Sequence, residues 1–294
     1  MRISGFSFVR NAIELYYPVV ESIRSILPIC DEFVVAAGDS TDGTTELLRT
    51  IADPKLRIIE TVWDQNLFKR GAINAQQSNL ALDACSGDWC FYLQADEVIH
   101  ESELPGLVDR MRTYLADARV EGMLFEYRHF FADYDHFHTG HAWYRREVRI
   151  VRNGIGARSW KSAQGFRKRD GRKLHVVPAG ARMFHYGWVR PPRLMTRRRK
   201  AFLTIHEGPE AAQQKVPDAD ASYDFGLLRG RTRFTGTHPA VMDARIAEKD
   251  WTVVPSAEST QRHDLPSQRF FQFVENGVLS FKIGEHRNYI LLPS

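Results

Sequence analysis

The sequence predicts an α/β fold in which parallel strands form the core of a mixed sheet. Over roughly the first hundred residues, strand-like and helix-like segments alternate, as they do in β-α-β units. A turn rich in glycine and helix-capping residues, 38–44, follows the second strand-like segment. Residues 88–97 form an apolar segment that ends in two acids. Because ligands of open α/β sheets bind beyond the carboxyl ends of strands, this segment predicts a polar site at the sheet edge.

The elements of this half are predicted from local signals. Runs of β-favouring residues predict strands at 2–9, 32–37, 56–60 and from 88 onward. A helix is predicted over 18–27, because Pro18 suits a first turn, apolar residues recur on one side, and Pro28 cannot continue the helix. Capping residues predict a second helix over 45–52, and the pattern over 72–85 predicts a third.

The ends of the first, second and fourth strands are expected to meet at one edge of the sheet, because parallel crossovers are nearly always right-handed. The residues at these ends are Ser7, Arg10, Gly38, Asp39, Gln94, Asp96 and Glu97. A base or ribose could bond to Asp39 and to the backbone near Phe6. A cation such as Arg10, Lys69 or Arg70 could neutralise a diphosphate.

The two acids that end the fourth strand have two interpretations. In the first, Asp96 points into a ligand crevice and holds a divalent cation, since Mg²⁺ and similar ions take carboxylate ligands and share them with substrate phosphates. In the second, Glu97 begins a helix over 97–107, whose positive N-terminal end favours acids. The residues alone leave both interpretations open.

Composition indicates a globular protein of a reducing compartment. A chain of 294 residues with 43% hydrophobic residues can bury a substantial core, as one large domain or as one domain with an extension. Cys30, Cys85 and Cys90 lack metal-ligand spacing. With no recognisable leader or membrane-spanning run, we expect a cytoplasmic protein. The net charge of +4 is concentrated in clusters such as 197–200, which suit phosphates or an anionic membrane, although a solvated helix face is the commoner explanation.

Four blocks of sequence resemble the family 2 glycosyltransferases, which bind nucleotide sugars with the fold called GT-A. ISGFSFVRN at 3–11 is similar to that family's opening strand and loop, and VVAAGDSTDGT at 34–44 is similar to its VVDDGSTDGT turn. NLALDACSGDW at 79–89 resembles its N-x-G/A-L-x-x-A-x-G-D-Y stretch. Gln94, Ala95 and Asp96 then stand where the family has its D-x-D metal motif. Four blocks in order are more specific than any one of them.

The chain departs from the family pattern at three places. Gly38 and the residue before it replace acids of the turn, so Asp39 would take the base-recognition role. Ser78 replaces a common arginine, and Gln94 replaces the first acid of D-x-D, which leaves Asp96 as the surest metal ligand. These changes keep open a catalytically inactive relative that binds a nucleotide sugar or a glycan.

The resemblance implies an inverting, metal-dependent sugar transfer from a nucleoside-diphosphate sugar to a glycan or glycolipid, such as a surface-glycan or lipopolysaccharide precursor. The implied donor-binding residues are Phe6, Ser7, Arg10, Gly38, Asp39, Lys69, Arg70, Gln94 and Ala95. The implied ligands of Mn²⁺ or Mg²⁺ are Asp96 and His185, which is similar in place to a late histidine of several relatives. A histidine that only hydrogen-bonds within a turn is the alternative for His185.

Inversion also requires a carboxylate base near the attacking hydroxyl. Glu147 is the first candidate, because relatives carry an acid a few residues before an arginine, here Arg149. An ion pair between Glu147 and Arg149 is the structural alternative. Asp135 and then Asp133 are the reserves.

Residues 101–190 are expected to form the acceptor side. Strands are predicted over 124–131 and 147–151, and a β-hairpin over 166–177 with its turn at Asp170 and Gly171. A metal could also bind the cluster of Asp133, Asp135, His136, His138 and His141, although a polar loop over the site is the simpler interpretation.

We therefore predict a catalytic domain over 1–190, with a nucleotide-binding half (1–100) and an acceptor half (101–190), followed by a mostly helical extension over 191–294. The extension begins with a basic helix over 193–206, which either packs on the catalytic domain or makes a peripheral contact with the inner face of the membrane. No nucleic-acid partner is expected, although the basic clusters keep a polyanion-binding protein as a rival.

Overall fold

The computed structural model describes residues 1–138, 140, 143–228, 231–256, 270, 274–275 and 287–293. Its strands are β1 (Ile3–Val9), β2 (Glu32–Ala37), β3 (Leu56–Glu60), β4 (Trp89–Tyr92), β5 (Glu97–Ile99), β6 (Gly122–Phe131), β7 (His136–His138), β8 (Arg146–Arg152), β9 (Ala157–Trp160), β10 (Gly165–Lys168), β11 (Leu174–Trp188), β12 (Arg231–Arg233) and β13 (Tyr289–Leu291). Its α-helices are α1 (Val19–Ile26), α2 (Thr44–Arg49), α3 (Ala72–Asp83), α4 (Leu104–Leu115), α5 (Pro192–Glu207), α6 (Pro209–Lys215) and α7 (Asp243–Ala247).

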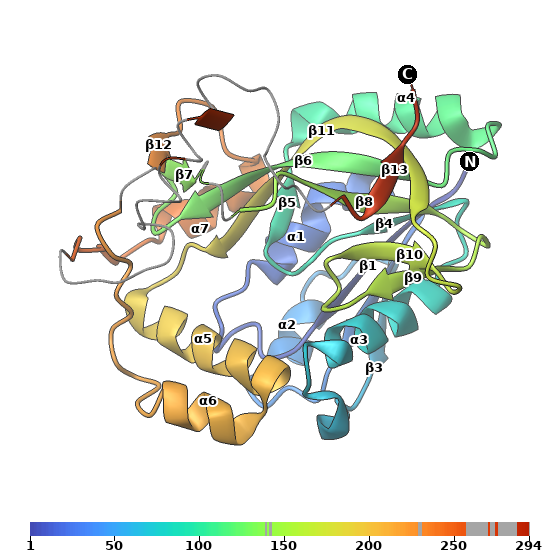
Figure 1. Cartoon of the computed structure of the whole chain (residues 1–294). Helices are drawn as coiled ribbons and strands as arrows, with labels where there is room; N and C mark the ends of the chain where they lie inside the picture. Colours follow the sequence, from blue (N-terminus) through green and yellow to red (C-terminus); the bar gives the residue numbers. More distant parts are fainter. Residues whose placement is uncertain are drawn as a thin grey trace.

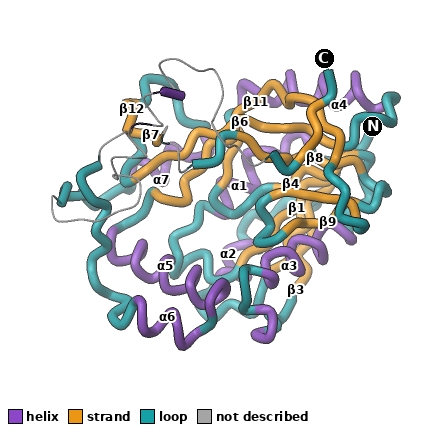
Figure 2. Tube along the Cα trace, viewed as in Figure 1, coloured by secondary structure: helices purple, strands orange, loops and turns teal. Residues whose placement is uncertain are grey.

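Eleven of the described strands form one mixed sheet, which curls through the molecule (Figure 1). Its order is β12-β7-β6-β8-β4-β1-β2-β3, and β11 joins β6, β5 and β13. Strands β9 and β10 form a separate antiparallel pair. The predicted α/β fold with a mixed sheet is therefore confirmed, and the helices surround the strands (Figure 2).

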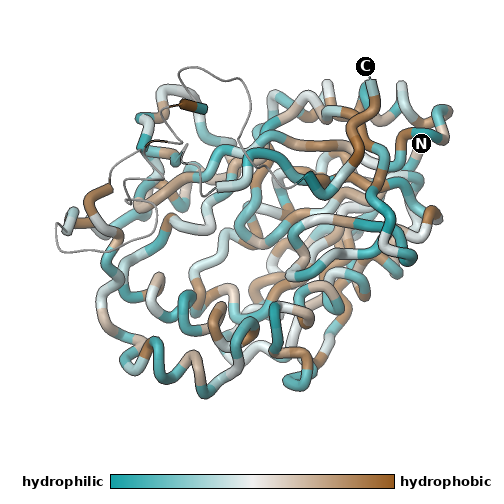
Figure 3. The backbone as a smooth tube through the Cα atoms, viewed as in Figure 1, coloured by the Kyte–Doolittle hydropathy of each residue, from teal (hydrophilic) through white to brown (hydrophobic). Residues whose placement is uncertain are grey.

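The first half of the sheet follows the prediction closely. Strands β2 and β3 have the predicted bounds, and the three predicted helices occur as α1, α2 and α3. Strand β1 runs parallel to both β2 and β4, so the ends of these three strands do meet at one edge. Both faces of these strands are buried, which explains their continuous apolar runs: Phe33 and Val35 join one core cluster while Val34 and Ala36 join the other. Hydrophobic residues accordingly concentrate in the central strands (Figure 3).

One of the two interpretations of the acids after β4 is wrong, and the predicted hairpin is only partly confirmed. Glu97 does not begin a helix: it opens β5, which pairs antiparallel with β11, and α4 begins only at Leu104. The hairpin over 166–177 is formed only next to its turn, where the Gly171 amide donates to the Lys168 carbonyl, the Lys168 amide donates to the Arg172 carbonyl, and Arg167 pairs antiparallel with Lys173. Farther from the turn, β10 pairs with β9 and β11 pairs with β6.

The segment after residue 190 contributes both helices and strands. Helix α5 begins it, as predicted, and α6 follows at once, where no helix was predicted. Strand β12 then pairs with β7, and β13 pairs in parallel with β11, so this segment extends the main sheet at two places. The division into domains at residue 190 stays a prediction. Among the described residues, no helix combines the length and the apolar character needed to cross a bilayer.

Candidate active site

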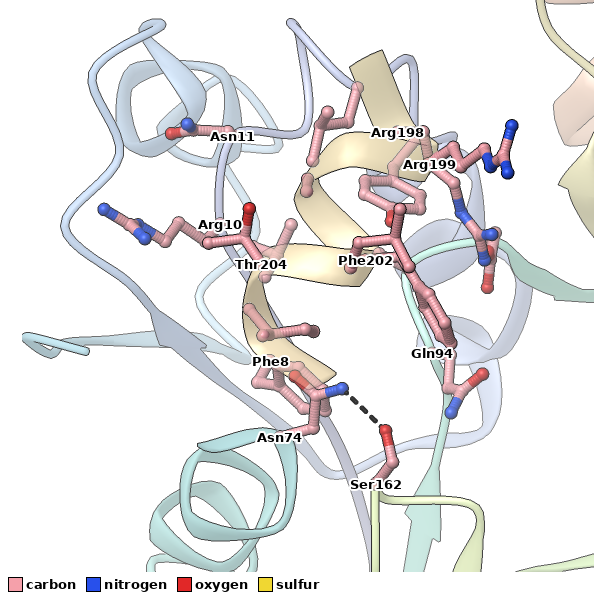
Figure 4. Close-up of a pocket in the computed structure, with 18 of the residues that line it drawn as sticks. Phe8, Arg10, Asn11, Asn74, Gln94, Ser162, Arg198, Arg199, Phe202 and Thr204 are labelled. Carbon is pink, nitrogen blue, oxygen red and sulfur yellow. Dashed lines mark hydrogen bonds between the residues drawn. The ribbon is translucent and has the colours of Figure 1, made fainter. Parts of the chain in front are cut away.

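A pocket of about 830 Å³ lies where β1 and β4 end, and this volume suits a ligand of nucleotide-sugar size. Its walls come from residues that follow β1, from residues 94–96 after β4, and from the end of β11. Helix α5 supplies a further wall, with Arg198, Arg199, Phe202 and Thr204 among its contributions (Figure 4). Asn74 of α3 also lines the pocket, and its side-chain amide donates to the Ser162 hydroxyl (Figure 4).

A buried ion pair fixes the turn that carries Asp96. Arg149 binds both carboxylate oxygens of Glu97, each at 2.8 Å, and both side chains are fully buried. The Tyr127 hydroxyl donates to Glu97 Oε1 at 2.7 Å, and the Gln94 amide donates to Oε2 at 3.0 Å. Burial alone would raise the pKa of Glu97, but Arg149 lowers it below its ordinary value. The predicted partner of Arg149 is therefore corrected from Glu147 to Glu97, which acts as a structural anchor.

Asp96 and His185 face each other at the pocket. His185 Nε2 lies 3.7 Å from Asp96 Oδ1, and both residues are nearly inaccessible. Burial raises the pKa of Asp96, although Arg198 and Arg190 oppose this rise. Burial also lowers the pKa of His185 to about 4, so its imidazole is neutral at neutral pH. A neutral imidazole beside a carboxylate is a donor set that suits a divalent transition metal.

Gly187 keeps the space beside these two side chains open. A Cβ atom at this position would lie 2.6 Å from His185 Nε2 and 2.8 Å from Asp96 Oδ2. Any larger residue would therefore fill the space that both donor atoms face. The arrangement fits a cation that Asp96 and His185 hold together with ligand oxygens. Among the described residues, no group of three or more His, Cys, Asp and Glu side chains is placed to hold a metal. The phosphates of a bound nucleotide would therefore supply the remaining ligands of such a cation.

Arg198 brings positive charge to the same place from α5. It lines the pocket, and its guanidinium is the first of the charges that oppose the rise in the pKa of Asp96. Its Nε atom is buried and has no hydrogen-bond partner among the described residues. The rings of Trp188 and Phe202 lie 5.6 and 5.4 Å from its guanidinium carbon. Arg198 is thus packed between two rings, keeps an N–H group without a partner among the described residues, and lies near Asp96 and His185. An arginine in such a place is suited to bind a phosphate group.

The opposite wall explains one departure from the family pattern. Arg10 Nε lies 3.1 Å from Asp39 Oδ1, and the Trp63 amide donates to the same oxygen at 3.2 Å. A Cβ at residue 38 would lie 2.4 Å from the indole nitrogen of Trp63, so only Gly38 leaves room for this tryptophan. Trp63 lines the pocket with Phe8, and their ring centroids are 6.2 Å apart.

The structure brings part of the predicted site together. The pocket lining contains Arg10, Gln94, Ala95, Asp96 and His185. It does not contain Phe6, Ser7, Gly38, Asp39, Lys69, Arg70, Glu147 or Asp135.

Each of the residues outside the lining has a described environment, and their roles stay predictions. Phe6 packs in the core, and the Ser7 hydroxyl donates to the Leu93 carbonyl at 2.7 Å. The Arg70 amide donates to the His206 carbonyl at the end of α5, and neighbouring Lys69 is exposed.

The two candidate bases lie on different elements. Glu147 lies in β8, where its Oε2 is 2.9 Å from the position of a Cβ on Gly165. Asp135 accepts a backbone hydrogen bond from Phe234. In the neighbouring cluster, Asp133 pairs with His136 and Arg231, and His141 lies outside the described residues.

The sequence model of glycosyl transferase family 2 matches residues 9–185, more than half of the chain. The chain belongs to glycosyl transferase family 2. The match begins at the end of β1 and closes on His185, so it spans the strand ends and the Asp96 turn of the pocket. It stops before α5, and Arg198 therefore lies outside the matched segment.

Solved structures of glycosyltransferases are also similar to parts of this family 2 chain. S. aureus TarS 1-349 in complex with UDP-GlcNAc is 19% identical, with 44% of this chain and 35% of that chain covered and a TM-score of 0.31. Glucosyl-3-phosphoglycerate synthase from Mycobacterium tuberculosis, with Mn²⁺, UDP and glucosyl-3-phosphoglycerate, is 20% identical, with 44% of each chain covered and a TM-score of 0.30. The mannosyltransferase PcManGT from Pyrobaculum calidifontis, with GDP-Man and Mn²⁺, is 25% identical, with 44% of this chain and 35% of that chain covered and a TM-score of 0.32.

The matched part thus spans less than half of each of these solved chains. The search of curated proteins gives no match.

Sequence reasoning missed three contributors to the site. Arg198 was visible only as part of a basic cluster, and nothing in the sequence places that helix at the pocket. Gly187 follows His185 by two residues, a spacing that puts both on the same face of a strand and so gave a usable signal. His129, which bonds to His185, carries no motif of its own.

Proposed function

We propose that this family 2 chain is a metal-dependent, inverting glycosyltransferase that moves a sugar from a nucleoside-diphosphate donor to a glycan or glycolipid acceptor, such as a surface-glycan or lipopolysaccharide precursor. One observation carries the proposal: Asp96 and His185 face the same space, which Gly187 keeps open, inside a pocket of suitable size. The acceptor class rests on the family resemblance.

Asp96 Oδ and His185 Nε2 would hold the cation, Mn²⁺ or Mg²⁺. When bound, the cation would stabilise the negative charge that develops on the departing diphosphate. Arg198 would donate to the same diphosphate from α5, so that the metal and the guanidinium share its negative charge. Glu97 and Arg149 would take no part in the chemistry, because they already satisfy each other and hold the Asp96 turn in place.

The nucleoside would lie toward Phe8, Arg10 and Trp63, at the ends of β1 and β3. Aromatic rings at this wall offer a stacking surface for a base. Asp39 would be held by Arg10 for a role in base recognition. Its Oδ2 oxygen has no hydrogen-bond partner among the described residues and could accept from a base N–H.

The base that deprotonates the acceptor remains Glu147 in this proposal, with Asp135 as its reserve. Neither side chain lines the pocket, so the acceptor hydroxyl would have to reach beyond it. Exchange of Glu147 for Gln should leave donor binding intact and abolish transfer if this assignment is correct.

One observation favours a second candidate, an inactive module that binds a nucleotide sugar or a glycan. Gln94 replaces the first acid of the metal motif, and its side-chain amide donates a hydrogen bond to the Ala163 carbonyl at 3.1 Å. Such a module would bind a donor without turning it over.

The test is calorimetric binding of a panel of nucleoside diphosphates, with and without Mn²⁺, to the wild type and to Asp96→Asn. Asp109→Asn is the matched control, because Asp109 pairs with Arg112 on the exposed side of α4. We expect one diphosphate to bind in a Mn²⁺-dependent manner, with the dependence lost only in Asp96→Asn. Diphosphate binding that is unchanged by Mn²⁺ and by Asp96→Asn would overturn the metal site. Release of diphosphate from the matching sugar donor then separates the transferase from the inactive module.

A further inference from the structure

His129 and His185 form a buried pair behind the pocket. They are register partners in the parallel ladder between β6 and β11. Their Nδ1 atoms lie 2.9 Å apart, and the two rings are nearly perpendicular, at 82°. His129 is 2% exposed and His185 is 6% exposed. A bond at this distance requires one Nδ1 to carry a proton and the other to carry a lone pair.

The backbone decides which nitrogen carries the proton. His129 Nε2 lies 2.7 Å from the carbonyl oxygen of Tyr144. A carbonyl oxygen can only accept, so His129 Nε2 must carry a proton, and in a neutral imidazole Nδ1 is then bare. With His129 neutral, His185 Nδ1 donates to His129 Nδ1, and a neutral His185 then has no second proton for Nε2.

The result is an unshared lone pair that faces an acid. The bare Nε2 of His185 and Oδ1 of Asp96 are 3.7 Å apart, too far for a good hydrogen bond, and Nε2 has no proton to donate to the carboxylate in this tautomer. Two electron-rich atoms held toward the same space repel each other. A cation between them would remove that repulsion.

The surrounding aromatic groups hold this arrangement. The Tyr127 ring stacks on His129 with centroids 5.3 Å apart, and the Tyr144 ring meets its edge at 4.6 Å. The Tyr127 hydroxyl in turn binds Glu97. His129 is thus packed on the same groups that fix the Asp96 turn.

We propose that His129 is a positioning residue that fixes His185 as the Nδ1–H tautomer and so presents the Nε2 lone pair to a metal shared with Asp96. The inference rests on the metal site of the proposed function. Metal-bound histidines usually give their second N–H to a carboxylate, a carbonyl or water. Here a second histidine would receive it, with the Tyr144 carbonyl setting the direction.

The first test reads the tautomer without any metal. Nitrogen-15 spectra of histidine-labelled, metal-free protein distinguish a protonated ring nitrogen from a bare one, and His185→Asn assigns the signal. We expect His185 to be protonated at Nδ1 and bare at Nε2. In His129→Phe, which keeps the bulk but removes the acceptor, we expect the proton to move to Nε2, where Asp96 can receive it. In His129→Asn, the amide oxygen lies about where Nδ1 was, and the original tautomer should return.

The second test measures Mn²⁺ affinity by calorimetry in the presence of the diphosphate that the wild type binds. Loss of an outer-shell partner typically weakens metal binding about 10- to 100-fold, so His129→Phe should fall in that range and His129→Asn should recover much of the loss. His175→Gln is the control, because His175 lies in β11, the strand of His185, but contacts Glu121 instead of the pocket. Circular dichroism confirms that each variant is folded.

The outcomes separate the two proposals. A wild-type His185 with its proton on Nε2, or with protons on both nitrogens, overturns the role of His129 whatever the protein binds. Unchanged Mn²⁺ affinity in His129→Phe overturns it as well. Absence of Mn²⁺ binding in the wild type overturns the metal site of the proposed function, and with it the role assigned to His129.

Discussion

At the scale of single residues, the buried ion pair between Glu97 and Arg149 holds the turn that carries Asp96. One interpretation of the sequence made Glu97 the start of a helix, yet its carboxylate is fully occupied by Arg149, Tyr127 and the backbone amide of Gln94. A sequence can place an acid after a strand but cannot say which of two adjacent acids turns inward. That choice depends on Arg149, which is far away in the chain and reaches Glu97 only because β8 lies beside β4.

The Glu97–Arg149 pair gives the first prediction. In Glu97→Gln, the buried Arg149 would lose its counter-charge, and we expect the free energy of unfolding to fall by about 3–5 kcal/mol, as is typical when one member of a buried pair is removed. Urea denaturation would measure the change. The double variant Glu97→Gln, Arg149→Met should lose less than the single variant, because no charge is left stranded. An equal or greater loss in the double variant would contradict this explanation.

Gly187 gives a second residue-scale prediction. In Gly187→Ala, the new methyl group would lie within 2.6–2.8 Å of His185 Nε2 and Asp96 Oδ2, in the space assigned to the cation. We expect Mn²⁺-dependent diphosphate binding to be lost while the protein still folds, as judged by calorimetry and thermal melting. Gly106→Ala is the control, because a Cβ there meets nothing within 4 Å. Intact Mn²⁺-dependent binding in Gly187→Ala would place the cation elsewhere.

At the scale of elements, α5 shows how far a local pattern can be interpreted. Its bounds were predicted within a few residues, and packing on the catalytic domain was one of two interpretations. The pattern could not show which face covers the pocket. Arg197 turns away and binds Asp220 at 2.8 Å, whereas its neighbour Arg198 lines the pocket. Only the tertiary position of the helix distinguishes these two arginines.

These adjacent arginines form a matched pair for the third prediction. In Arg198→Met, we expect the affinity for the diphosphate to fall at least about tenfold, since a hydrogen bond to a charged group contributes about 1.5–3 kcal/mol. In Arg197→Met, the affinity should stay near that of the wild type, because the residue pairs with Asp220. Calorimetry with the same diphosphate measures both. Equal losses would indicate a general charge effect of α5.

Glu121 gives a prediction about the junction of β6, β10 and β11. Burial would raise its pKa, but Lys168 and the His175 amide, at 2.9 Å from Oε2, lower it below 4.5. The Glu121 carboxylate therefore binds a proton more readily in the unfolded chain than in the folded one. The stability that this carboxylate contributes is present at pH values above its ordinary pKa and is lost as the pH falls through its lower pKa in the folded protein. In Glu121→Gln, the loss of stability on going from about pH 5 to pH 3 should be smaller than in the wild type.

Urea denaturation across this pH range would test the expectation. Glu46→Gln serves as the control, because Glu46 lies exposed beside Arg49 on α2. If Glu121→Gln loses as much stability with falling pH as the wild type does, Glu121 is not the source of that pH dependence.

At the scale of the whole molecule, the first hundred residues were predictable because their contacts are nearly local. Strands β1, β2, β3 and β4 pair with one another within the same βαβ series, and the four resembled blocks lie at these strands and the turns between them. The second half of the fold was not predictable in this way, because β11 contacts β6, β5 and β13. These strands are distant in the sequence from β11 and from one another. No periodicity in 174–188 indicates which of these strands it pairs with.

The last prediction concerns the proposed boundary at residue 190. Strand β13 adds to β11, and its Tyr289 is 5% exposed within a core cluster that also contains Phe6 and Tyr92. Arg245 binds Glu21 of α1 at 2.8 Å, which ties the later segment to the first helix. Because the segment after 190 completes the core and one wall of the pocket, we expect the full chain to unfold in a single transition in urea. We expect a chain truncated after residue 190 to bind hydrophobic dyes and to lose diphosphate binding. A truncated chain that folds cooperatively would instead establish 1–190 as an independent domain, and its affinity for the diphosphate would then measure what α5 contributes.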